Sequence, residues 1–466
     1  MDRLPAEILL RILSYLQPKL GPLLRVNKQW FYCGLSLVWR EAFWSDLSRI
    51  PKDRRILYAT AIRRLFLWET AREQVEEFSH FAYPRLKHLN IGSDPSAKVD
   101  IAWLKRYMHA ELQSIEFLGD FDPELLLHLQ TNCRQLRKIS ITAPGARLTP
   151  EIFLRFLQNT LVTEISFEGN NIGHLLDLDT LGHLVRRENL EELSLGCTIK
   201  KLPKDIKTWE HGRSFQKLCV KVTHDVLPSF ISNFTSLHDL NLDVEGEQRS
   251  KPTSIDFNHL SALTQLRRLN ICLNGVKDFD KGDLLFIKDL KHLRELGLTG
   301  TITVALTATE FNDLDFEELV ATLPNLRVLT FHMYRLYLTT QTLAALGQFC
   351  PLLERCDLMG GFNMLQLRLY QTPLFPRLHS LCIRDFTSLV IDRTGMKAPT
   401  KLGFESPEDH VKQLEEHFPK LQDLTLTYAN DTRFSRLDEH EFSNSVLYKW
   451  RARQEERERC FLENYS

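Results

Sequence analysis

Cysteine and histidine are the residues of this chain with the clearest capacity for chemistry, and their spacing argues against a reactive or metal site. The 466-residue chain has nine cysteines and sixteen histidines. It contains no CxxC pair, and no matching cysteine or histidine ligands accompany Cys350 and Cys356. His410 and His417 are too far apart for a metal-binding pair of the usual kind on one helical face. We expect neither a metal nor a cofactor.

Enzyme motifs are also missing from the sequence. It has no HExxH, GxSxG, Walker A or GxGxxG motif, each of which places catalytic or phosphate-binding groups at a fixed spacing. Cys460 lies in a charged, helix-like segment with nothing nearby that favours a reactive thiolate. We therefore expect no enzymatic activity in this chain.

The charge balance narrows the classes of partner. With 59 basic and 60 acidic residues, the net charge is −1, so no field of one sign is available to hold a nucleic acid or an acidic membrane. There is no run of eighteen apolar residues and no secretory signal pattern. Scattered cysteines in an odd number are typical of reduced thiols. We expect an intracellular protein, cytoplasmic and/or nuclear, that binds neither nucleic acid nor membrane.

The N-terminal forty residues predict three short helices with more apolar surface than they can bury. Pro5 begins a first helix whose apolar residues recur at helical spacing, and Pro18 ends it. A short, irregular second helix contains Gly21 and Pro22, and Asn27 is a suitable N-cap for a third. A domain this small buries only about 60% of its unfolded surface. The apolar excess consists of Leu4, Pro5, Ile8 and Leu9.

The order of residues in this segment resembles the F-box. The motifs are LPxEIL from Leu4, ILSYL, then LxxLLxVxKxW ending at Trp30, and a Trp-Arg pair at Trp39. The resemblance implies three helices that dock on the Skp-type adaptor of a cullin–RING ubiquitin ligase. It also implies that Leu4, Pro5, Ile8 and Leu9 contact the adaptor, and that further residues contribute to this interface or to the core of the module, namely Leu23, Leu24, Val26 and Trp30.

A second pattern, LxxLxL, occupies most of the remaining chain. Fourteen copies occur, at 62–67, 86–91, 112–117, 136–141, 162–167, 190–195, 215–220, 237–242, 266–271, 293–298, 326–331, 353–358, 378–383 and 421–426. One copy is weak evidence, but fourteen at periods of mostly 22 to 33 residues form the leucine-rich-repeat signature. Helical patterns lie between them, for example after Pro123, Pro150 and Ser406. The prediction is an α/β chain: a three-helix F-box followed by a solenoid with parallel strands on the concave face and helices outside.

We predict four parts: an F-box at 1–46, a joint at 47–58, a solenoid of about fourteen irregular repeats at 59–433, and a C-terminal helical cap or tail at 434–466. The period is interrupted at 387–405, where we expect a projecting loop.

Residues that alternate with the inward leucines should line the concave face. On the middle repeats the charged ones are candidates for contact with a protein partner, and they are Glu164, Glu168, Glu192, Lys217, Lys221, Asp239, Asp243 and Arg268. The function expected from the whole pattern is the substrate-recognition subunit of an SCF-type ubiquitin ligase, with catalysis in partner subunits. A non-degradative scaffold and a small-molecule-gated receptor remain alternatives.

Overall fold

The computed structural model describes residues 4–16, 20–68, 72–92, 101–202, 215–232, 234–246, 255, 257–274, 277–279, 281–300, 306–308, 311–333, 338–387, 390–391, 397–398, 406–427 and 437–465. Contacts divide the chain into two units, one of residues 1–198 with 203–205 and the other of residues 199–202 with 206–466. Each is described by itself.

The first unit opens with the N-terminal helices, which are α1 (Ala6–Tyr15), α2 (Leu20–Leu23) and α3 (Lys28–Val38). Helix α3 begins where its sequence predicts, because the Asn27 side chain accepts a hydrogen bond from the Trp30 N–H at 2.9 Å. The second helix has only four residues, in agreement with the irregularity expected from its glycine and proline. Residues 17–19, including Pro18, lie outside the described part.

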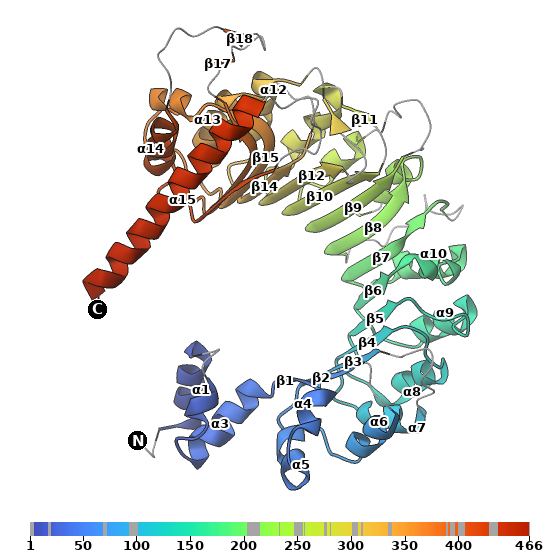
Figure 1. The fold of residues 1–466 in the computed structure, drawn as a ribbon. Coiled ribbons are helices and arrows are strands. Elements are labelled where there is room, and N and C mark those ends of the chain that lie inside the picture. The colour runs from blue at the N-terminus through green and yellow to red at the C-terminus, as the bar shows by residue number, and fades with distance from the viewer. Residues whose placement is uncertain are drawn as a thin grey trace. The chain divides into compact units, whose positions relative to one another are not determined.

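Seven parallel strands follow in the first unit (Figure 1). They are β1 (Glu41–Phe43), β2 (Arg64–Leu67), β3 (His88–Gly92), β4 (Ser114–Leu118), β5 (Lys138–Thr142), β6 (Glu164–Glu168) and β7 (Glu192–Ile199). Between them lie α4 (Trp44–Ser48), η1 (Lys52–Arg54), α5 (Arg55–Ala59), α6 (Arg72–Ser79), α7 (Ile101–Tyr107), α8 (Glu124–Asn132), α9 (Pro150–Gln158), η2 (Asn170–His174) and α10 (Leu178–Arg186).

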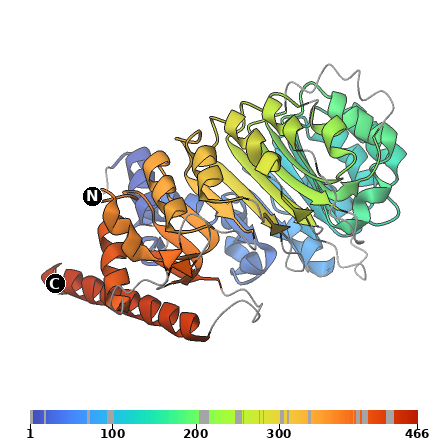
Figure 2. The ribbon, with the colours of Figure 1, turned by 90° about the horizontal axis from the view of Figure 1, so that it is seen from above.

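The second unit repeats this plan. Its sheet strands are β8 (Lys217–Thr223), β9 (Asp239–Glu245), β10 (Arg268–Asn274), β12 (Glu295–Gly300), β14 (Val328–Phe331), β15 (Arg355–Phe362), β16 (Ser380–Phe386) and β19 (Asp423–Leu426). Its helices are α11 (Leu227–Ile231), η4 (Asn258–Ala262), η5 (Lys281–Asp289), α12 (Asp313–Val320), α13 (Thr340–Phe349), η6 (Met364–Leu369), α14 (Pro407–His417) and α15 (Leu437–Tyr465). Figure 2 shows the helices preceding α15 gathered on one face of these strands.

Two short pairs complete the second unit: β11 (Lys277–Asp278) with β13 (Leu306–Thr307), and β17 (Val390–Ile391) with β18 (Lys397–Ala398). The second pair lies within the predicted projecting loop, most of which is outside the described residues.

The core of each unit consists of the repeated leucines, because strand residues alternate between buried and accessible positions. Leu65 and Leu67 in β2 are 1% and 2% exposed, and Leu240 and Leu242 in β9 are 0% and 2% exposed. These side chains point toward the helices, and the residues between them line what we call the open sheet face. All fourteen LxxLxL copies become strands of this kind, which confirms the predicted fold class of N-terminal helices followed by a leucine-rich-repeat-like parallel sheet.

The chain closes with α15, whose first half packs on α14 and β16. Val446 and Trp450 are buried there, at 0% and 4% exposure. The side chain of Ser443 accepts a hydrogen bond from the Phe386 N–H at 2.9 Å and donates one to the Phe386 carbonyl at 3.0 Å. This half of α15 therefore covers the end of the repeat array.

The predicted boundaries of the four parts stay predictions. In the structure, β1 falls within the predicted F-box range, and η1 and α5 lie at the predicted joint.

Candidate functional site

An apolar stripe runs along the accessible side of α1. Ile8, Ile12 and Leu16 follow one another at a spacing of four residues, and their side chains are 48%, 38% and 41% exposed. Tyr15 lies beside them and is 76% exposed. We call these four residues the α1 stripe. Residues four apart lie on one helical face, so the stripe offers a continuous apolar surface on one side of α1.

Leu9 does not belong to this accessible surface, and the expectation that it forms part of an exposed excess is wrong. It is 0% exposed and packs with Leu13 and Leu20 in the core of the three helices. Leu23 and Trp30 pack against the same cluster. Leu9 and Leu13 are four residues apart and follow Ile8 and Ile12 directly in the sequence. They form the buried side of the broad apolar face of α1, next to the exposed α1 stripe.

The other residues predicted to contact the adaptor differ in their exposure to solvent. Pro5 is exposed, Val26 is 56% exposed and Leu4 is half-buried. Leu24, which follows α2, is half-buried against Gly34, where an added Cβ would clash with Leu24 Cδ2. Glycine at this position leaves room for the Leu24 side chain to pack on α3. Contact of any of these residues with an adaptor stays a prediction.

Aromatic packing and strand pairing join the three helices to the first repeat. The ring of Trp39, which follows α3, lies 4.7 Å from that of Tyr58 in α5, and the Phe31 ring lies 6.2 Å from the same Tyr58 ring. Strand β1 then pairs with β2, and the Arg40 carbonyl accepts hydrogen bonds from the N–H groups of Arg63 and Arg64 at 3.0 and 2.9 Å. The three N-terminal helices are thus packed against the first repeat.

The eight predicted substrate-binding residues all occupy alternate strand positions on the open sheet face, where the sequence pattern placed them. They are divided between the two units, however. Glu164, Glu168 and Glu192 belong to the first unit, and the other five belong to the second. Binding of a substrate by any of them stays a prediction.

Charged groups on the open face of the second unit mostly neutralise one another. Lys221 forms ion pairs with Glu245 at 3.2 Å and with Asp243 at 3.7 Å. Partial burial acts to lower the pKa of Lys221, but the hydrogen bond to Glu245 and the charge of Asp243 hold it above its ordinary value. Burial likewise raises the pKa of the Asp243 carboxyl, against the opposing effect of Lys221.

A second group of ion pairs extends this neutralisation. Arg268 lies between Asp239 at 3.2 Å and Glu295 at 3.3 Å. Two strands further on, His332 Nε2 and Asp357 Oδ1 lie 2.8 Å apart, a contact that is an ion pair only when the imidazole is protonated. A charged partner of this face would have to compete with existing ion pairs.

The first unit presents a different surface, which the sequence analysis missed. Phe43 and Phe66 stack at 4.7 Å, and the Trp68 ring stands across both at 6.1 and 5.4 Å. Phe43 is 45% and Trp68 38% exposed. A signal was present, because Phe66 and Trp68 follow the two buried leucines of β2 at positions where most repeats carry polar residues.

Acidic residues lie further along the same face. Glu116 of β4 accepts a hydrogen bond from the Asn90 side chain. Burial, followed by the nearby charge of Glu168, raises the pKa of the Glu116 carboxyl. By contrast, Glu164 forms an ion pair with Lys138 at 3.2 Å. Within the described residues, neither Glu116 nor Glu168 has an ion-pair partner.

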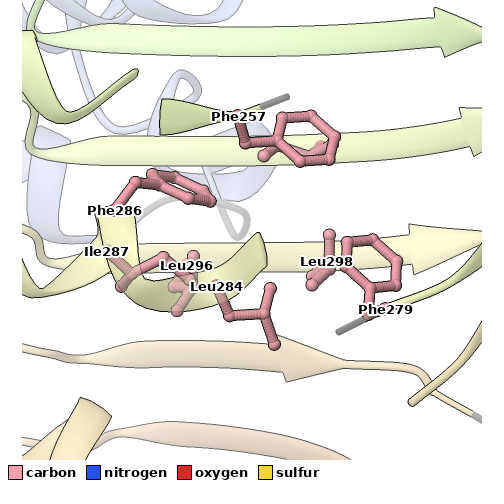
Figure 3. Close-up of a pocket in the computed structure, with 8 residues that line it drawn as sticks. Phe257, Phe279, Leu284, Phe286, Ile287, Leu296 and Leu298 are labelled. Carbon is pink, nitrogen blue, oxygen red and sulfur yellow. The ribbon is translucent and has the colours of Figure 1, made fainter. Parts of the chain in front are cut away.

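One apolar gap lies in the core of the second unit (Figure 3). It is lined by buried apolar side chains from β10, β12 and η5 and from the segments before η4 and after β11, namely Phe257, Ile271, Phe279, Leu284, Phe286, Ile287, Leu296 and Leu298. Such a gap belongs to the packing of the repeats. The described residues contain no group of three or more potential metal ligands. Nor do they include a helix long and apolar enough to cross a membrane.

Comparison with known proteins identifies the N-terminal helices. A protein-family model described as F-box-like matches residues 1–44, a range that includes α1 to α3 and the strand β1. The chain therefore begins with an F-box-like domain. No curated protein matches the sequence. Among solved structures, the crystal structure of a TLR13–ssRNA13 complex matches with 14% sequence identity and a TM-score of 0.40. That match covers 78% of this chain and 52% of the other, so this chain spans about half the length of that protein.

Proposed function

We propose that this chain is the substrate-recognition subunit of an SCF-type cullin–RING ubiquitin ligase. The F-box-like helices would bind a Skp-type adaptor, and the open sheet face would bind the target protein. The α1 stripe is the observation that carries this proposal, since it is an apolar surface on the element that the family match identifies as F-box-like. A non-degradative scaffold that binds the same adaptor is the principal alternative.

The stripe has the geometry and apolar content of a docking surface. Helices that dock in grooves use apolar residues one turn apart, which is the spacing of Ile8, Ile12 and Leu16. Burial of one large aliphatic side chain contributes about 1.5–3 kcal/mol, and a few such residues usually dominate an interface. Because Ile8, Ile12 and Leu16 are 38–48% exposed in the free chain, each would contribute about half of this value, and the stripe would form one part of a larger interface.

The mechanism of such a receptor is proximity. A target held near the ubiquitin-transferring subunit reacts in an effectively intramolecular step, so this chain needs no catalytic group of its own. Packing of Trp39 on Tyr58 supports the proposal, because it fixes the F-box-like helices relative to the first repeats. A target bound to those repeats would be held at a defined position.

The test compares charged substitutions in two exposed apolar sites. Ile8→Asp/Ile12→Asp should abolish co-purification of a Skp-type adaptor and cullin. Leu161→Asp, at a position that is 81% exposed in the repeat array, should retain both. Unchanged adaptor binding by the double variant would exclude the proposed interface. Adaptor binding by the wild type without ubiquitin transfer to any bound protein, with the proteasome inhibited, would favour the scaffold.

A further inference from the structure

The open sheet face of the first unit carries an exposed apolar surface with an acidic end. We define the aromatic–acidic surface by its six residues, which are Phe43, Phe66, Trp68, Leu118, Glu116 and Glu168. Leu118 is 41% exposed and extends the apolar part from β2 toward β4. The aromatic rings lie at the β1–β2 end, and the carboxylates lie on β4 and β6.

Strand register fixes the order of these residues. Phe66 pairs with Asn90, and Asn90 pairs with Glu116. One position further along the face, Gly92 of β3 pairs with Leu118, which is linked through Thr142 to Glu168. The surface therefore forms two adjacent rows across the strands, each with an aromatic residue at the β2 end and a carboxylate at the other.

Glycine at position 92 makes room for the indole of Trp68. A Cβ at Gly92 would lie only 3.0 Å from Trp68 Cδ1, closer than side chains normally pack. Trp68 can therefore lie against β3. Its backbone carbonyl also accepts a hydrogen bond from the Trp44 indole N–H at 2.7 Å, which holds the aromatic end in place.

Charge complementarity selects the partner. Glu41 and Glu164, in the neighbouring row, are already paired with Arg64 at 3.0 Å and with Lys138 at 3.2 Å. Glu116 and Glu168 form no such ion pair among the described residues. Burial and the charge of Glu168 raise the pKa of the Glu116 carboxyl, and the charges of Lys138 and Arg64 only partly oppose this. A cation bound here would relieve the repulsion between the two carboxylates, and arginine could also stack on the aromatic rings.

We propose that the aromatic–acidic surface binds an extended segment of the target protein that carries one large apolar side chain and two basic side chains. The proposal rests on the proposed function, since it names the class of target. Neighbouring strands lie about 4.8 Å apart. A segment in the extended polyproline II conformation advances about 3.1 Å per residue with three residues per turn, so every third side chain points to the same side. The distance from β2 to β4, two strand spacings, therefore corresponds to about three residues of the bound segment, and the distance from β2 to β6, four spacings, to about six. The basic residues should stand about three and six positions from the apolar one.

Fluorescence anisotropy of labelled peptides tests this spacing with the full chain. The probe is a Gly/Ser peptide with Trp, Arg three positions away and Arg six positions away, made in both sequence orders. At least one order should bind, and replacement of both arginines by glutamate should weaken binding at least tenfold. Equal binding of the basic and acidic peptides, or absence of binding by both orders, would overturn the proposal.

Three variants locate the site. The double variant Glu116→Gln/Glu168→Gln should bind the basic peptide about tenfold more weakly than the wild type. Glu168→Arg should restore binding of a peptide that carries glutamate at the sixth position. Glu245→Gln, on the second unit and paired with Lys221, should bind like the wild type. Equal affinity in the Glu116/Glu168 variant and the wild type would refute the site. Because Glu168 is exposed, we expect its substitution to leave the fold intact. Thermal melts of the variants and the wild type check this.

Failure of this inference is distinguishable from failure of the proposed function. Glu116→Gln/Glu168→Gln should leave adaptor binding unchanged, because its residues lie on the sheet and not on α1. Equal binding of the basic and acidic peptides would refute the aromatic–acidic surface alone. Retained adaptor binding by Ile8→Asp/Ile12→Asp would refute the proposed function alone.

Discussion

The ring of Trp39 packs edge-on against the ring of Tyr58, with 4.7 Å between the ring centroids. Trp39 follows the last residue of α3, and Tyr58 lies in α5, next to the first repeat. This aromatic contact is one of several that join the F-box-like helices to the array that follows them, beside the Phe31–Tyr58 contact and the pairing of β1 with β2.

Removal of this contact should loosen the joint without unfolding the repeats. Trp39→Ala should destabilise the joint by about 2 kcal/mol, less than the cost at a fully buried site because Trp39 is half-buried. Hydrogen exchange should accelerate in α3 and α5 and stay unchanged in β4 to β6. Tyr58→Phe keeps the ring and serves as the control. Uniform acceleration through the first unit would contradict this account.

The positions of the strands in the main sheet could be predicted because they depend on a local pattern, but the first strand of that sheet, β1, escaped it. Strand β1 pairs with β2 so that Ala42 stands opposite Leu65. Trp39, Ala42 and Trp44 therefore hold the places that leucines occupy in the other repeats. These residues also belong to the segment that resembles the F-box, and the sequence analysis therefore did not recognise β1 as a fifteenth strand of the sheet.

Side-chain partnerships could be predicted less well, since they depend on register between strands. The sequence placed Lys221 and Asp243 on one face, but only the pairing of β8 with β9 shows that they stand opposite each other and form an ion pair. Similarly, helical periodicity could not tell Leu9 from Ile8. Both lie within a broad apolar stripe, and packing against α3 decides which one is buried.

Leu9 and Ile8 should accordingly respond differently to truncation. Leu9→Ala should destabilise the three-helix module by about 2–5 kcal/mol, because the side chain is fully buried. Ile8→Ala should change stability by about 0.5 kcal/mol or less, because half of the side chain is exposed. Native-state hydrogen exchange of α1 and α3 provides the measurement. Similar losses in the two variants would refute the assignment of Leu9 to the core.

The hydrogen bonds of Ser443 should make α15 part of the stable array. Ser443→Ala would leave the buried N–H and carbonyl of Phe386 without this partner, which costs about 1–3 kcal/mol. Hydrogen exchange of α15 at increasing urea concentrations, around Trp450, which is buried in the same contact, should show an earlier midpoint. Ser445→Ala, at a half-exposed position of the same helix, is the matched control. An unchanged midpoint in Ser443→Ala would show that the helix end does not depend on these bonds.

His410 should make the second unit sensitive to mild acid. Its ring is fully buried between Phe386 and Phe442, with centroid distances of 6.2 and 5.1 Å. Burial lowers the pKa of His410 from 6.5 to about 4, and the nearby charge of Asp409 only partly opposes this. Between these two values the unfolded chain binds a proton that the folded chain does not, so folding stability falls as pH decreases.

The stabilising contribution should therefore be fully present above pH 6.5 and be lost as pH falls toward 4, by at most about 3 kcal/mol. His410→Phe removes the titrating group and keeps an aromatic ring between its two neighbours. Its melting temperature should decline less than that of the wild type between pH 7.5 and 4.5. His259→Gln, at an exposed position, should follow the wild-type curve. Parallel pH dependence in the wild type and His410→Phe would mean that other groups control the acid response.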